Sequence, residues 1–173
     1  MNILFVSLGC DKNLVDTEVM LGLLASRGHQ MVDSEEIADV IVINTCCFIH
    51  DAKEESIQTI LEMAEYKKAG SCKALIVTGC LAQRYKQEII DEIEEVDAVL
   101  GTTSYDKIVE AIDEALAGHT SVEMTDIDAL PLVESKRLVT TGGHFAYLKI
   151  AEGCDKHCTY CIIPKIRGNF RSV

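Results

Sequence analysis

The chain has 173 residues, of which 48% are hydrophobic and 25% charged, and its net charge is −12. This length suits about one ordinary domain with a buried core, and no run of ~18 apolar residues is present to predict a membrane span. The negative charge disfavours a nucleic-acid-binding surface and favours a basic protein partner.

Short apolar runs rich in Val and Ile recur through the first hundred residues. Runs of this kind are typical of strands that are buried on both faces of a parallel sheet. The predicted strands cover residues 3–10, 39–46, 73–80 and 96–102, with a weaker one at 30–34.

Helical patterns fill the gaps between these runs, at 13–28, 51–70, 82–95 and 104–118. Asn13 is expected to be the N-cap of the first helix, and Gly28 to follow its end. The 3.6-residue period of the second helix predicts a buried face; its members are Ile57, Ile60, Leu61 and Ala64. The alternation predicts an α/β fold built on a layered parallel sheet with right-handed crossovers.

The alternation stops after residue 118. Residues 137–141 are expected to form a short strand, and 144–150 a second strand that runs directly into a cysteine motif. So short a second unit cannot close a core of its own, so the chain is expected to be the first third of something longer. The predicted divisions are an N-terminal domain at 1–118, a linker at 119–136 and a truncated second unit at 137–173.

Three of the eight cysteines follow predicted strands in the same phase, in "VSLGC", "VINTC" and "IVTGC". Cys10, Cys46 and Cys80 are therefore placed just past three carboxyl strand ends. These ends share one edge of a parallel sheet, where open α/β folds bind ligands, so the three thiols are expected to converge. The alternative for each is a buried structural cysteine, which packs as a small hydrophobe.

Two other cysteines are not expected to belong to the converging set. Cys47 directly follows Cys46, but "NTC" matches "TGC" in phase and favours Cys46 as the member of the set. Cys72 precedes its strand and is expected at the opposite edge of the sheet.

A second set of cysteines lies in "EGCDKHCTYC", where Cys154, Cys158 and Cys161 fall within eight residues. A disulfide would leave one thiol over, and a tetrahedral zinc site needs four ligands. His157 is a candidate fourth ligand. It is adjacent to Cys158 in the sequence, however, and two adjacent residues have poor geometry for binding the same tetrahedral ion. Three thiolates suit an iron–sulfur cluster that keeps one iron open to a substrate or cofactor.

The N-terminus, "MNILFVSLGCDKNLVD", has no basic segment before its apolar run and meets an acidic residue early. A secretory signal is therefore not expected, and we predict a cytoplasmic location. In a reducing compartment eight cysteines indicate metal or catalytic sites rather than disulfides.

The C-x3-C-x2-C spacing, with Tyr160 before the third cysteine, resembles the radical S-adenosylmethionine enzymes, in which the motif follows the first strand of a β/α barrel. Together with "SLGCDKNLVDTEVM", "NTCCFIHDAKEES" and "TGCLAQRY", it resembles the methylthiotransferases over essentially the whole chain. The stretches at 7–18 and 48–56 are most similar to the branch that modifies an aspartate of ribosomal protein S-twelve. One departure is Cys47, where a glycine is expected.

The resemblance implies two 4Fe–4S clusters and S-adenosylmethionine. The auxiliary cluster would be held by Cys10, Cys46 and Cys80, and the radical cluster by Cys154, Cys158 and Cys161. S-adenosylmethionine would bind the open iron of the second cluster, with Tyr160 near its adenine.

The implied reaction adds a methylthio group to the aspartate β-carbon of ribosomal protein S-twelve, with an electron donor such as flavodoxin. The alternatives are a tRNA adenosine methylthiotransferase, which the acidic charge makes less favourable, and an inactive iron–sulfur binding fragment. The 173-residue chain alone is expected to be inactive, because most of the implied barrel lies beyond Val173.

Several polar residues near these motifs have two interpretations. Asn13 and Asp16 either serve the first cysteine or cap a helix and lie at the surface. Asn44 and Thr45 either tune a cluster through hydrogen bonds or end a strand. Arg167 either faces substrate or cofactor or is a solvated loop residue.

Overall fold

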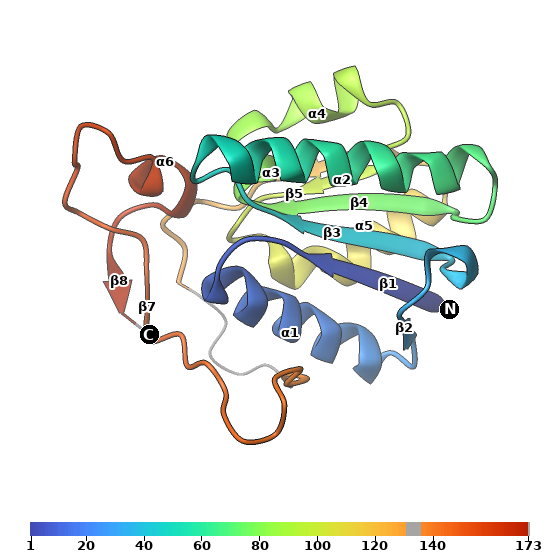
Figure 1. The fold of residues 1–173 in the computed structure, drawn as a ribbon, viewed down its shortest axis with the longest axis horizontal. Coiled ribbons are helices and arrows are strands. Elements are labelled where there is room, and N and C mark those ends of the chain that lie inside the picture. Colours follow the sequence, from blue (N-terminus) through green and yellow to red (C-terminus); the bar gives the residue numbers. More distant parts are fainter. Residues whose placement is uncertain (131–135, 173) are drawn as a thin grey trace.

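A computed structural model describes residues 1–130 and 136–172. Its centre is a six-stranded parallel sheet in the order β2-β1-β3-β4-β5-β6 (Figure 1). The predicted α/β fold with a layered parallel sheet is thus confirmed. The strands are β1 (Asn2–Ser7), β2 (Gln30–Val32), β3 (Val40–Thr45), β4 (Ala74–Gly79), β5 (Ala98–Leu100) and β6 (Ser121–Glu123).

Helices cover both faces of the sheet (Figure 1). One face carries α1 (Asp11–Ser26) and α5 (Ile108–Leu116), and the other carries α2 (His50–Lys68), α3 (Cys80–Tyr85) and α4 (Gln87–Glu92). Two short 3₁₀ turns, η1 (Glu35–Ile37) and η2 (Tyr105–Lys107), complete the connections.

Every residue of β3 and of β4 is buried, because the helices cover both faces of these central strands. Alternate residues point to opposite faces. Ile41 and Ile43 pack in the cluster that contains Ile60 of α2, whereas Val40 and Val42 pack in the cluster beneath α1 and α5.

The first helix begins earlier than predicted. Its N-cap is Cys10, whereas Asn13 lies inside the first turn and is fully buried, so the prediction of Asn13 as the N-cap was wrong. Its amide is instead held by backbone carbonyls of two neighbouring segments. Gly28 follows the C-cap Arg27 with φ +81°, as predicted.

The buried face of α2 is rotated from the predicted one. Ile60 and Ala64 are buried as expected, but Ile57 and Leu61 are 38% and 45% exposed. Ser56 and Met63 face inward in their place. The Ser56 hydroxyl is accommodated there because it bonds both the N–H and the carbonyl of Cys46.

The expected helix at 82–95 is two helices, α3 and α4, separated by Lys86 with φ +47°. The sheet also continues past residue 118, where a linker was expected, because β6 pairs with β5 at Ala98, Val99 and Leu100. A three-residue strand is too short to show a period in the sequence. Residues 131–135 of the expected linker lie outside the described residues, and the division into domains stays a prediction.

The strands expected at 137–141 and 144–150 do not form in these described segments. A strand needs a neighbour to complete its hydrogen-bond ladder, and only β7 (Ala151–Glu152) has one, in antiparallel β8 (Arg171–Ser172). A short helix, α6 (Ile163–Arg167), lies between them, and the three elements lie beyond the carboxyl edge of the large sheet (Figure 1). None of the helices in the described part is long and apolar enough to cross a bilayer.

Candidate functional site

Three neighbouring strands of the sheet each lead into a cysteine. Cys46 directly follows β3, Cys80 directly follows β4, and Cys10 comes three residues after the end of β1. Because β1, β3 and β4 are adjacent and parallel, these residues lie along one edge. The edge includes the point between β1 and β3 where the strand order reverses, a usual place for ligands in such sheets.

The three cysteines line one pocket of about 520 Å³. Cys46 and Cys80 are 7% and 5% exposed, whereas Cys10 is exposed. The other walls are mainly apolar, and they come from the start of α2 and from α6; they include Phe48, Ile49, Ala52, Ile163 and Ile166. The structure thus brings together the three residues that the strand phase singled out, while their role as ligands stays a prediction.

Gly9 allows the loop that carries Cys10 to approach Cys46 closely. Its φ is +91°, and a Cβ atom at this position would lie 2.7 Å from Cys46 Cβ and 3.0 Å from Cys46 Sγ. Any other residue would both strain the backbone and displace Cys46.

Two of the sulfurs lie at the beginnings of helices. Cys10 is the N-cap of α1, and its side chain makes no capping hydrogen bond within the described chain. Cys80 is the first residue of α3. The N-terminal end of a helix favours negative charge, as a thiolate ligand would carry.

The Cys80 thiol has two opposing influences on its pKa. Burial raises the pKa, and the positive charge of the neighbouring Arg167 guanidinium lowers it; burial prevails. Arg167 itself is only 2% exposed, so its interpretation as a solvated loop residue was wrong. The sequence did not indicate this burial, because two partners of Arg167, Asp16 and Asn13, are more than 150 residues away along the chain.

Cys47 is buried and is not among the described residues that line the pocket. Its thiol donates to the Cys80 carbonyl over 3.2 Å. Burial and the nearby Cys80 raise the pKa of Cys47 to about 11, which disfavours the thiolate that a metal requires. Cys72 is buried ahead of β4, at the opposite edge, where its thiol bonds the Ala74 carbonyl.

Two asparagines join the loops that carry the first cysteine set. Asn13 Nδ2 donates to the carbonyls of Leu8 (2.8 Å) and Thr45 (3.0 Å), which links the β1 loop to the end of β3. Asn44 Nδ2 in turn donates to the Asn13 carbonyl over 2.9 Å. Thr45 Oγ1 donates to the Thr78 carbonyl over 2.5 Å. Asn44 and Thr45, the two polar residues at the end of β3, therefore both donate hydrogen bonds to backbone carbonyls.

The second cysteine set is more open. Cys158, Cys161 and Tyr160 line a surface hollow of about 380 Å³, and Tyr160 is 91% exposed. Cys154 is half-buried, and its N–H donates to the Gly168 carbonyl over 3.0 Å. Cys154 is outside the set of described residues that line the hollow, so only two of the three thiols are brought together there.

In the described ranges, no three Cys, His, Asp or Glu side chains are already placed to coordinate a single metal ion. A cubane cluster is larger than one ion, and its ligand sulfurs therefore stand further apart. Three sulfur donors beside mainly apolar walls provide the soft ligands that iron–sulfur clusters use. The residues at the first site therefore fit a cluster.

Residues 2–101 match the model of the Uncharacterized protein family UPF0004. The chain belongs to this family. The UPF0004 match extends from β1 to β5, so it contains Cys10, Cys46 and Cys80 and ends before the second cysteine set.

The similarity to curated proteins covers both sets. The chain is 68% identical over all its 173 residues to the ribosomal protein uS12 methylthiotransferase RimO of Lachnoclostridium phytofermentans. It is 52% and 54% identical, over 96% of its length, to proteins of the same name from Clostridioides difficile and Desulforamulus reducens. The chain spans 39%, 37% and 38% of the lengths of these three relatives.

Proposed function

We propose that the chain is the N-terminal part of a radical S-adenosylmethionine methylthiotransferase that modifies ribosomal protein uS12. The observation that carries this proposal is the pocket shared by Cys10, Cys46 and Cys80 at the ends of three adjacent strands. The similarity of both cysteine sets to proteins named as uS12 methylthiotransferases supports the reaction and the substrate.

Each cysteine set would hold one 4Fe–4S cluster. Cys10, Cys46 and Cys80 would bind the auxiliary cluster, with Phe48 and Ile163 among the side chains that exclude water from it. The set at Cys154, Cys158 and Cys161 would bind the radical cluster and leave one iron for S-adenosylmethionine. Once bound, these groups supply the radical chemistry needed at an unactivated carbon. Tyr160, exposed beside this set, would lie against the adenine.

The charge of the chain favours a protein substrate over tRNA. Binding a phosphate backbone requires Lys and Arg to displace counterions, but the chain has 16 Lys and Arg against 28 Asp and Glu. An acidic surface would instead steer a basic ribosomal protein toward the enzyme. We further propose a reducing cytoplasm, where eight cysteines serve metal or catalytic sites rather than disulfides, and an electron donor such as flavodoxin.

A chimeric enzyme tests this proposal. The matching 39% of the Lachnoclostridium phytofermentans relative would be replaced by this chain, and the product would be offered uS12 and tRNA under anaerobic, reducing conditions. We expect mass spectrometry to detect one methylthio group on an aspartate of uS12. The 173-residue chain alone should give no product.

The unaltered relative serves as the positive control, and a chimera with Cys10, Cys46 and Cys80 changed to Ala as the negative one. Modification of a tRNA adenosine with uS12 unchanged would establish the alternative substrate. An inactive chimera beside an active relative, although it binds its clusters, would contradict the proposal.

A further inference from the structure

A network of buried charges lies beside the first cysteine set. Arg167 Nη1 donates to Asp16 Oδ2 over 2.7 Å and to Glu152 Oε2 over 3.2 Å. Lys149 pairs with the same two carboxylates, at 3.1 Å for Glu152 Oε2, and Lys12 Nζ lies 3.2 Å from Glu152 Oε1. All but Lys12 have side chains no more than 8% exposed.

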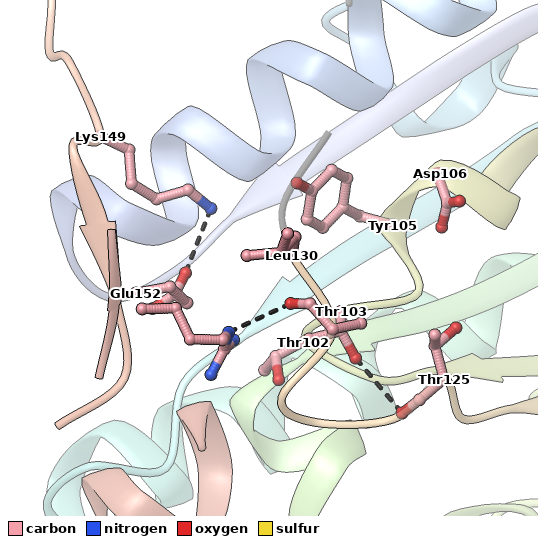
Figure 2. Close-up of a pocket in the computed structure, with 10 residues that line it drawn as sticks. Thr102, Thr103, Tyr105, Asp106, Thr125, Leu130, Lys149 and Glu152 are labelled. Carbon is pink, nitrogen blue, oxygen red and sulfur yellow. Dashed lines mark hydrogen bonds and ion pairs between the residues drawn. The ribbon is translucent and has the colours of Figure 1, made fainter. Parts of the chain in front are cut away.

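The network joins the two regions of the chain that carry cysteines. Asp16 belongs to α1, the helix that Cys10 caps, whereas Glu152 belongs to β7, two residues before Cys154. Figure 2 shows Lys149, two residues before this strand, pointing toward Glu152. Lys149 Nζ also lies 5.2 Å from the Tyr105 ring centre. Arg167, from α6, binds both carboxylates and so fastens the second segment to the first.

Arg167 also reaches the ligand set itself. Its Nη2 donates to Asn13 Oδ1, and Arg167 lines the same pocket as Cys80. Cys80 Sγ lies 3.8 Å from the same Asn13 oxygen. One buried guanidinium therefore lies beside the third cysteine and bonds the asparagine whose amide holds the loops of the other two.

The charges of the network do not cancel. The carboxylates are Asp16 and Glu152, and the cations are Arg167, Lys149 and Lys12, which leaves one positive charge in excess. Lys12 is 44% exposed, and Asp11, outside the network, adds a negative charge to the same pocket. The buried positive charge beside the thiols, which become negative when they bind iron, is therefore that of Arg167. A cation beside a cluster sulfur stabilises the reduced, more negative state and raises the reduction potential.

We propose that Arg167 is a positioning residue for the cluster at Cys10, Cys46 and Cys80, and that its ion pairs fix the second cysteine segment against this site. The inference rests on the proposed cluster but adds a role that neither cysteine motif contains. Arg167 orients Asn13, whose Oδ1 lies 3.8 Å from Cys80 Sγ, supplies positive charge beside the pocket, and keeps β7 and α6 against the carboxyl edge of the sheet.

The first part of the proposal, that Arg167 raises the reduction potential of the cluster, is tested in a parent chain with Cys154, Cys158 and Cys161 changed to Ala. Only the cluster at Cys10, Cys46 and Cys80 can form in this parent. We expect Arg167→Met to move the midpoint potential to a more negative value in an EPR-monitored titration, and Arg167→Lys to restore most of the shift. Arg27→Gln, which removes an exposed cation at the far end of α1, is the matched control and should leave the potential unchanged.

The second part of the proposal, that Arg167 holds the second cysteine segment against the sheet, is tested by amide hydrogen exchange. The iron-free chain with all its cysteines is compared with its Arg167→Met variant. Arg167→Met leaves two buried carboxylates short of a partner, so exchange in residues 151–171 should rise about tenfold or more, while β3 and β4 keep their protection. If Arg167→Met does not fold, Arg167→Lys and Asp16→Asn give the same comparison with smaller changes in volume.

The possible failures are distinguishable. A parent chain that binds no iron would contradict the proposed function, and the exchange experiment would still decide the docking role. A parent that binds a cluster, with the same potential and the same exchange in Arg167→Met as in Arg27→Gln, would overturn this inference.

Discussion

Cys46 and Cys47 are neighbours in the sequence, but their sulfurs face different surroundings. Cys46 lines the pocket with Cys10 and Cys80, whereas the Cys47 thiol donates to a backbone carbonyl. We therefore expect Cys46→Ala to abolish cluster binding and Cys47→Ala to retain it, with a stability loss of about 1 kcal/mol from the lost packing and weak hydrogen bond. Iron content and the visible spectrum after anaerobic reconstitution measure both effects.

The opposite result would show that the ligand is Cys47 and that the comparison of the strand ends chose the wrong cysteine. That outcome requires loss of iron in Cys47→Ala together with normal iron in Cys46→Ala. Circular dichroism of both apo variants excludes misfolding as the cause.

Gly9 gives a second prediction at the scale of single residues. Gly9→Ala combines positive-φ strain with a contact of 2.7 Å to Cys46 Cβ, so it should destabilise the fold by about 1–3 kcal/mol and weaken cluster binding. Gly28→Ala is the matched control, because Gly28 has φ +81° but no atom within 4 Å of the added methyl. Urea unfolding and iron content check the pair.

If both variants bind iron equally well, close packing of Gly9 on Cys46 is not needed for the site. A loss of iron in Gly28→Ala alone would also contradict this prediction, since Gly28 follows the C-cap of α1 and does not line the pocket.

The sequence predicted the positions of Cys10, Cys46 and Cys80, because a strand end is a local pattern and parallel strand ends meet at one edge. It did not predict two partners of Arg167, Asp16 and Asn13, which are 151 and 154 residues away. A contact of this range depends on how the last segment packs on the sheet, which no local period records.

At the scale of elements, periodicity predicted the long strands and helices well and the short ones poorly. β3 and β4 form where continuous apolar runs indicated. The expected strand at 144–150 fails although its residues alternate, because alternation does not supply a pairing partner. The break between α3 and α4 at Lys86 likewise depends on a single backbone angle.

The contact between α1 and the segment after residue 136 predicts a dependence of stability on pH. The buried Glu18 carboxylate accepts hydrogen bonds from Arg137 Nε (2.7 Å) and from Thr140 N (2.6 Å) and Oγ1 (2.9 Å). Burial alone would raise the pKa of Glu18, but the Thr140 and Arg137 bonds outweigh burial and lower it.

Because the folded-state pKa is depressed, this contribution is complete above the unfolded value of about 4.3 and is lost as pH falls through the folded pKa. Glu18→Gln should therefore cost about 1–3 kcal/mol at pH 7 and much less near pH 3. Urea unfolding of wild type and variant at both pH values measures the difference. A difference that is equal at both pH values would mean that the Glu18 charge does not contribute.

At the scale of the whole molecule, the sheet order and the last segment create the site together. The reversal between β1 and β3 opens one edge, and α6 covers it with Ile163, Ile166 and Arg167. The N-terminal sheet therefore provides the thiols, and the second cysteine segment provides part of the wall. Neither region builds the pocket alone.

The most direct test of this account is the iron and acid-labile sulfide content of the 173-residue chain after anaerobic reconstitution. With Cys154, Cys158 and Cys161 changed to Ala, the chain should still bind about four iron and four sulfide and give the EPR signal of a reduced 4Fe–4S cluster. With Cys10, Cys46 and Cys80 changed instead, this tightly held cluster should disappear. Retention of the full iron and sulfide content in the second variant, or no cluster in the first, would contradict the assignment of the pocket at the carboxyl edge of the sheet as an iron–sulfur site.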